Sequence, residues 1–171
     1  YKPGDVFEIR AMGIGENDRR LDSGYFNCLE KAVDAICRLE NAHHPRAIYV
    51  TMNPFVPELL ARTDNNVKPW ARDTTTDKLI KRIRWLFIDL DPIRGPGVSG
   101  ISATAEEVEQ ARIAALKIRE HLSSLGFHEP IEGNSGNGIY LLYPVDLPND
   151  EASKELVHGI WKALSARFTT A

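Results

Sequence analysis

Residues 85–104 read WLFIDLDPIRGPGVSGISAT, and this stretch decides how the second half of the chain is expected to fold. Its first six residues, WLFIDL, are almost all apolar, which is typical of a strand buried on both faces. Residues 93–102 are rich in Gly, Pro and Ser and therefore predict a loop. Thr104 and Glu107 then form the T-x-x-E pattern of a capping box, which marks the start of a helix.

Regular patterns continue from this stretch to the C-terminus. Residues 130–132 and 139–145 predict two strands around a Gly-rich turn at 133–138. The helix that Thr104 opens ends at Gly126, and its apolar face is Val108, Ala111, Ala115, Ile118, Leu122 and Leu125. A last helix starts at 148–150, and its expected inward residues are Leu156, Val157, Ile160, Trp161, Leu164 and Phe168.

The predicted order over residues 85–168 is therefore β-α-β-β-α, in an α+β fold. This is the ferredoxin-like split βαβ pattern, β-α-β-β-α-β, without its last strand. The sequence ends at residue 171, where that strand should begin, so we expect that the chain is truncated.

The first half of the chain gives weaker signals. The longer elements that we expect are a strand at residues 6–11, a helix at 27–40 and a buried strand at 47–52. Short helical segments are expected at 57–62 and 78–84. Loops are expected at 13–23 and 64–77.

Composition sets limits on the class of protein. The 171 residues carry a net charge of −3, with 43% hydrophobic and 26% charged residues, which predicts one compact globular domain. No apolar run reaches the roughly 18 residues of a membrane helix, so we expect no membrane partner and a cytoplasmic location. Cys28 and Cys37 lack CxxC spacing, and we interpret them as buried thiols rather than a disulfide or a zinc site.

The charge is distributed unevenly along the chain. Residues 62–94 carry eight Lys or Arg and five Asp or Glu, whereas the segments on both sides have a net negative charge. The basic part, residues 62–84, is either a solvated surface or a track for a nucleic-acid strand. Its candidate contacts for nucleic acid are Lys81, Arg82 and Arg84.

Asp89 and Asp91 are the candidate metal ligands. Because they are one residue apart on a predicted strand, their side chains should lie on the same face. Two neighbouring carboxylates repel each other unless a cation lies between them, and Mg²⁺ or Mn²⁺ prefers such oxygen ligands. The alternative is a solvated strand end. The haloacid-dehalogenase phosphatases also begin with DxD after an apolar strand, so a phosphohydrolase stays open.

The turn Asn134-Ser135-Gly136-Asn137-Gly138 is the candidate phosphate-binding loop. Backbone N–H groups of a Gly-rich turn can bind an anion, and Ser135 adds a hydroxyl. A simple hairpin turn is the alternative. Arg10 and Arg94 are further candidate phosphate ligands, and Trp70 and Trp85 are candidates for base stacking.

Two blocks of this sequence, LFIDLDPIRGPGVSGISAT and GFHEPIEGNSGNGIYLLYPVDLPND, resemble the archaeo-eukaryotic primase superfamily. The likeness is to the primase-polymerase domains of its bacterial, phage and plasmid branch. The pieces FEIRAMG, LDSGYF, IYVTMNP and TTTD extend it over nearly the whole chain. The resemblance implies a two-lobed catalytic core, with an N-terminal lobe over residues 1–84 and an RRM-like half over 85–171.

The resemblance also implies roles for the two motifs. Asp89 and Asp91 would bind the catalytic divalent metals, Mg²⁺ or Mn²⁺, and no zinc is expected. Ser135, Gly136, Asn137 and Gly138 would hold the phosphates of the incoming nucleotide, with Tyr140 and Arg94. The family usually has His where this sequence has Tyr140. Its third Asp is not present in the chain, and Asp146 is expected to have a structural role.

The expected function is that of a DNA primase-polymerase. Such an enzyme makes or extends a primer on single-stranded DNA from nucleoside triphosphates, by two-metal nucleotidyl transfer. Fused or associated helicase or other replication and repair domains are possible partners. The alternatives are a metal-dependent phosphohydrolase and a non-catalytic nucleic-acid-binding relic of a primase.

Overall fold

The computed structural model describes residues 1–15, 19–94 and 101–169 of this α+β protein. The chain divides into two compact units, residues 1–84 and 85–171, which are described separately. The boundary falls at the position where the sequence divides the two expected lobes. Within the described residues no helix is long and apolar enough to cross a membrane.

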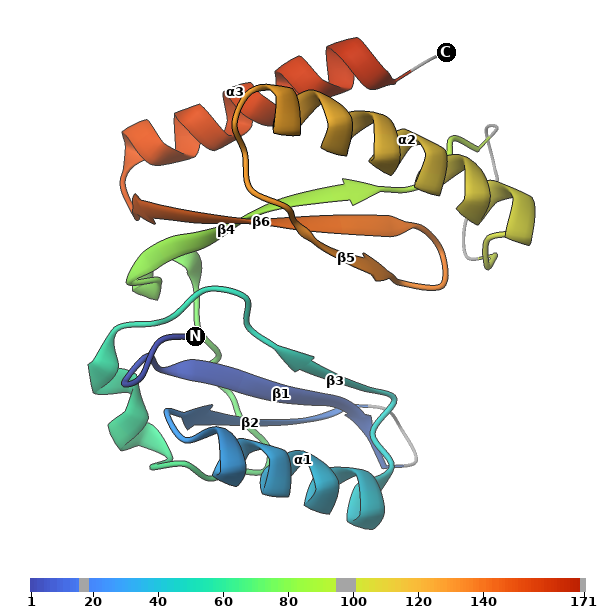
Figure 1. The fold of residues 1–171 in the computed structure, drawn as a ribbon. Coiled ribbons are helices and arrows are strands. Elements are labelled where there is room, and N and C mark those ends of the chain that lie inside the picture. Colours follow the sequence, from blue (N-terminus) through green and yellow to red (C-terminus); the bar gives the residue numbers. More distant parts are fainter. Residues whose placement is uncertain (16–18, 95–100, 170–171) are drawn as a thin grey trace. The chain divides into compact units, whose positions relative to one another are not determined.

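Unit 1 is built on a three-stranded antiparallel sheet in the order β2-β1-β3 (Figure 1). Its strands are β1 (Phe7–Ile14), β2 (Arg20–Phe26) and β3 (Ala47–Val50), and its helix is α1 (Leu29–His43). Two 3-10 helices follow, η1 (Pro57–Arg62) and η2 (Asp77–Leu79). Apolar side chains of β1 and β2 pack against Ala32, Ala35 and Leu39 of α1.

A buried carboxylate connects the sheet of unit 1 to a later segment. Glu8 on β1 has no exposed surface, and it accepts hydrogen bonds from the hydroxyls of Ser23 and Thr75. Arg10 donates to Glu8 at 2.7 Å and to the backbone oxygen of Thr75 at 2.8 Å. Arg10 is thus held by the fold and is not a free phosphate ligand.

This network sets the protonation of Glu8. Burial raises the pKa of the carboxyl, but the hydrogen bonds from Arg10, Ser23 and Thr75 and the Arg10 charge outweigh burial and lower the pKa below 4.5. The unfolded chain therefore takes up this proton before the folded chain does as the pH falls. The stability that Glu8 contributes is complete above pH 4.5 and is lost as the pH falls through the lowered pKa.

We expect the wild-type chain and Glu8→Gln to differ most in free energy of unfolding at neutral pH. The difference should shrink as the pH falls below 4.5, because a protonated Glu8 resembles Gln. Urea unfolding at several pH values measures this difference. Glu155→Gln, on the exposed side of the last helix, controls for the loss of one negative charge. A difference that stays constant with pH would contradict the role given to Glu8.

Several expectations for unit 1 were wrong. Residues 20–23 of the loop expected at 13–23 belong to β2, because the polar side chains of Asp22 and Ser23 are buried and hydrogen-bonded to Arg20 and Glu8. Of residues 78–84, where a short helical segment was expected, Lys78 and Leu79 belong to the 3-10 helix η2, whereas the last three residues already belong to strand β4, which begins at Arg82. The strand predicted at 47–52 is not fully buried, because Tyr49 and Val50 are exposed. The cysteines are free but not buried: Cys37 is exposed and Cys28 is half-buried.

Unit 2 has the predicted order β-α-β-β-α. Its elements are β4 (Arg82–Leu90, of which the first three residues belong to unit 1), α2 (Ala105–Ser124), β5 (Ile131–Asn134), β6 (Ile139–Pro148) and α3 (Glu151–Phe168). The sheet order is β4-β6-β5, and neighbouring strands run in opposite directions (Figure 1). Both helices cover the same face of this sheet. Residues 95–100 of the predicted loop at 93–102 lie outside the described residues.

The core of unit 2 lies between that face and the two helices. Leu86 and Ile88 of β4 and Leu141 of β6 pack against apolar residues of α2 and α3. The alternating burial along β4 corrects the expectation of a strand buried on both faces. Three residues expected to face inward are largely exposed, namely Leu125, Leu156 and Trp161. The capping box of Thr104 and Glu107 is confirmed, and both of its hydrogen bonds are formed.

Candidate metal and phosphate site

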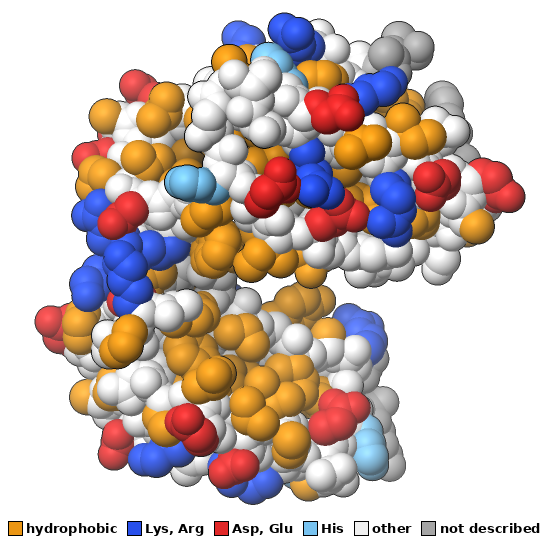
Figure 2. All heavy atoms as spheres, in the orientation of Figure 1, with side chains coloured by type: hydrophobic (Ala, Val, Ile, Leu, Met, Phe, Trp, Pro, Cys, Tyr) orange, Lys and Arg blue, Asp and Glu red, His pale blue; other side chains and the backbone are white. Residues whose placement is uncertain are grey.

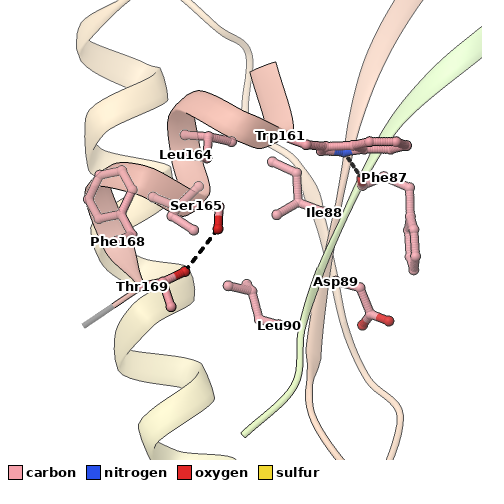
Figure 3. A pocket seen from close by; sticks show the side chains of 10 residues that line it. Phe87, Ile88, Asp89, Leu90, Trp161, Leu164, Ser165, Phe168 and Thr169 are labelled. Carbon is pink, nitrogen blue, oxygen red and sulfur yellow. Dashed lines mark hydrogen bonds between the residues drawn. The ribbon is translucent and has the colours of Figure 1, made fainter. Parts of the chain in front are cut away.

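Asp89 lies near the C-terminal end of β4, on the face of the sheet that the helices leave open, and Asp91 follows directly after the strand. Leu86 and Ile88 are buried and Leu90 packs against the same core, so the residues between them point the other way. Figure 3 shows the Asp89 carboxylate turned away from the α3 side chains. Both aspartates are exposed, which lets a hydrated ion approach them.

The charge of Asp91 affects the protonation of Asp89. Partial burial and the negative charge of Asp91 raise the pKa of Asp89 above 3.8, while a backbone hydrogen bond from Leu90 acts in the opposite direction. A cation between the two aspartates would remove this repulsion. The donor set, two carboxylates beside a turn with backbone N–H groups, fits Mg²⁺ or Mn²⁺, which commonly take one or two carboxylates plus substrate phosphates.

The glycine-rich turn packs directly against the end of β4. A Cβ atom placed on Gly138 would lie 2.5 Å from the backbone oxygen of Leu90 and 2.9 Å from Oδ1 of Asp91. Both contacts are too short for any side chain, so glycine is required at this position. The approach is possible because β6, which Gly138 precedes, is the strand next to β4. The structure therefore places the two predicted motifs in contact.

The turn satisfies its own backbone N–H groups in this structure. Ser135 Oγ accepts from the N–H of Asn137 at 3.3 Å and of Gly138 at 3.1 Å, and Asn134 Oδ1 accepts from Gly136 at 2.7 Å. Gly136 has a φ of 85°, a left-handed conformation that suits glycine. A phosphate bound here would have to replace the Ser135 and Asn134 oxygens as acceptor.

Arg94 is held by the segment that leads into α2. Its guanidinium donates to the backbone oxygen of Ile101 and lies 3.4 Å from the Glu107 carboxylate. Asn137 of the turn also contacts this segment, because its side-chain oxygen accepts from the N–H of Ala103 at 3.0 Å. Arg94 therefore anchors the start of α2, and it would have to leave Glu107 to bind a phosphate.

Tyr140 lies on β6, on the open face of the sheet, and its ring contacts residues of both neighbouring strands, β4 and β5. Its ring packs 5.9 Å from the ring of Phe87, centroid to centroid. The hydroxyl end of the ring covers Gly133 of β5, where an added Cβ would be 2.3 Å from the hydroxyl oxygen. The side chain thus needs glycine at its cross-strand partner position. The sequence did not indicate this packing, which depends on strand register.

The nucleic-acid candidates Lys81, Arg82 and Arg84 belong to unit 1. Lys81 is exposed, whereas Arg82 and Arg84 are half-buried and have interaction partners. Figure 2 shows Lys and Arg side chains gathered where β4 begins, the segment that carries these residues. Of the two tryptophans suggested for base stacking, Trp70 is 65% exposed and Trp85 is half-buried.

A cavity of about 350 Å³ runs along the outer edge of β4 (Figure 3). The β4 segment from Phe87 to Leu90 lines one side, and Leu164 and Phe168 of α3 line the other. Trp161, which we expected to point inward, instead donates from Nε1 to the backbone oxygen of Phe87 at 2.7 Å. The Trp161 side chain thereby supplies a hydrogen-bond donor to the Phe87 carbonyl, which lies on the edge strand β4.

The described residues contain no cluster of three or more His, Cys, Asp or Glu side chains that could hold a metal. The candidate site therefore has two protein carboxylates in the part of the chain that the structure covers. Comparisons with protein-family models, with curated proteins and with solved structures found no match to this chain.

Proposed function

We propose that this chain is the catalytic core of a DNA primase-polymerase, which makes or extends primers by template-dependent nucleotidyl transfer. The observation that carries the proposal is the contact between Gly138 and Asp91. It brings a candidate metal-binding carboxylate and a candidate phosphate-binding turn to one place. The likeness of both motifs to the primase-polymerase branch supports the reaction class.

Each part of the site has a role in this proposal. Asp89 and Asp91 hold the divalent ions, which when bound lower the pKa of an attacking 3′-hydroxyl and neutralise charge on the leaving pyrophosphate. The N–H groups of Gly136, Asn137 and Gly138 turn from the Asn134 and Ser135 oxygens to the triphosphate oxygens. The open face of the sheet, with Tyr140 and Phe87, contacts the sugar or the base.

The edge cavity fits the fold implied by the resemblance. A further strand paired with β4 would complete the RRM-like sheet and fill the apolar space between β4 and α3. That strand is where the resemblance implies a third metal-binding Asp. Such a strand would have to displace the Trp161 side chain from the Phe87 carbonyl.

A second candidate function is a nucleic-acid-binding module that has lost its chemistry. The observation in its favour concerns Tyr140, which stands at a position where the family usually has His. The Tyr140 ring packs on Gly133. A Tyr at this position cannot supply the positive charge of an imidazolium.

An assay with a primed single-stranded template, labelled deoxynucleotides and Mg²⁺ or Mn²⁺ separates the candidates. Primer extension supports the proposal. Phosphate release from small esters without template would instead identify a phosphohydrolase. DNA binding without either activity would favour the non-catalytic module.

A further inference from the structure

Unit 1 contains an open cavity of about 510 Å³ that the site on β4 does not use. Its floor includes Tyr25 of β2, and its walls come from the end of η1 and from residues 68–73. The wall segment is fixed to β2 by two backbone hydrogen bonds between Lys68 and Ser23, of 2.8 and 3.1 Å, and by one from Ala71 to Leu21 of 2.8 Å. The cavity is therefore built on the sheet.

The cavity is lined by three cations and one anion. Arg62, Lys68 and Arg72 are all exposed, and none of them forms an ion pair with another described residue. Arg62 lies over the Tyr25 ring at 5.9 Å. Asp73 supplies one negative charge, so the lining has a net charge of about +2 at neutral pH. Such a lining favours an anionic ligand with more than one charge.

Trp70 adds an aromatic surface to this lining. It is 65% exposed, and its φ of 55° lies in the left-handed region that bulky residues rarely adopt. The turn at Pro69 and Trp70 is held in place because the Trp70 N–H donates to Asp22 Oδ1 at 3.1 Å. Arg20, itself bonded to Asp22, packs 5.9 Å from the centre of the indole. A strained and solvent-exposed tryptophan that the fold holds in position is typical of a binding site.

We propose that this cavity holds single-stranded nucleic acid, with one base stacked on Trp70 and the adjacent phosphates bound by Arg62, Lys68 and Arg72. Stacking on an aromatic side chain beside a positively charged groove is the usual way to bind a single strand without reading its sequence. A free nucleotide fits less well, because the cavity is open and its cations come from two separate segments, the end of η1 and residues 68–72. The inference deepens the proposed function by naming where unit 1 holds the template.

Binding of fluorescein-labelled dT12 to the full chain, followed by fluorescence anisotropy, tests the inference. Trp70→Ala should weaken binding about tenfold or more, and Trp70→Phe should keep most of the affinity. Arg62→Gln, Lys68→Gln and Arg72→Gln should each weaken binding and reduce the salt dependence by about one phosphate contact. Lys31→Gln, an exposed cation on α1 outside the cavity, should bind as the wild type does.

Two further measurements separate the possible ligands. Binding of dT12 should quench tryptophan fluorescence in the wild type, and the quench should largely disappear in Trp70→Phe. Polyphosphate, which has no bases, should compete weakly and equally with wild type and Trp70→Ala. Stronger competition by oligoglutamate than by dT12 would overturn the proposal in favour of an acidic polypeptide. Unchanged dT12 binding in Trp70→Ala and in the triple cation variant would also overturn it.

The same assay distinguishes this inference from the proposed function. Asp89→Asn should bind dT12 normally, because Asp89 belongs to unit 2 and is not one of the residues that line the cavity. A chain that binds dT12 through Trp70 but never extends a primer would support the inference and contradict the polymerase. If the wild type extends primers but Trp70→Ala leaves template affinity unchanged, the result would support the polymerase and contradict the inference.

Discussion

Asp89→Asn is expected to lower primer extension by about 10³-fold, which corresponds to about 4 kcal/mol of transition-state stabilisation. Asn keeps the size of the side chain but removes the negative charge that holds the ions. Because Asp89 is exposed and its charge is already disfavoured by Asp91, the substitution should not lower the free energy of unfolding. Steady-state extension of a labelled primer measures the loss.

Glu155→Gln is the matched control for Asp89→Asn. It removes one carboxylate from the exposed side of α3 and should leave extension unchanged. Asp91→Asn should cause a loss similar to that of Asp89→Asn, because both carboxylates serve the same ions. Primer extension within twofold of wild type in both Asp variants would show that extension does not depend on this site.

Gly138→Ala is expected to weaken nucleotide binding about 10- to 100-fold and to destabilise the fold by about 1–3 kcal/mol. The new methyl group would lie 2.5 Å from the Leu90 oxygen and 2.9 Å from Asp91 Oδ1, so the turn must move away from β4. The N–H groups that we propose bind phosphate would move with it. Nucleotide titration and urea unfolding measure the two effects.

Gly159→Ala is the control for a glycine substitution that meets no other atoms. Gly159 lies within α3, and an added Cβ has nothing within 4 Å, so we expect about 0.5–1 kcal/mol of stabilisation and unchanged nucleotide affinity. If Gly138→Ala binds nucleotide as tightly as the wild type, the turn does not hold the phosphates.

The order of elements in unit 2 could be predicted because its signals are local. The capping box at Thr104, the spacing along α2 and the glycine-rich turn each specify an element without reference to the rest of the chain. Unit 1 was less predictable because β2 depends on distant partners. The buried Ser23 of β2 is compatible with a strand only because two partners satisfy its polar groups. Glu8 accepts a hydrogen bond from the Ser23 hydroxyl, and the Lys68 backbone forms hydrogen bonds with the Ser23 backbone.

The candidate site could be predicted in part for the same reason. The direction of Asp89 follows from alternation along β4, and the nearness of Asp91 to Gly138 follows from the order of a split βαβ sheet. The positions of Arg94 and Tyr140 could not be read in this way. Each depends on a side chain or a glycine elsewhere in unit 2, Glu107 for Arg94 and Gly133 for Tyr140.

The claim that Asp89, Asp91 and the 134–138 turn form one metal and phosphate site is tested most directly by the binding of Mn²⁺ with a deoxynucleoside triphosphate. Electron paramagnetic resonance counts the free ion, so the measurement does not depend on catalysis. We expect the wild type to bind Mn²⁺ more tightly when the nucleotide is present, and we expect Asp91→Asn and Gly138→Ala each to remove that enhancement. Equal enhancement in wild type and Asp91→Asn would contradict the site described here.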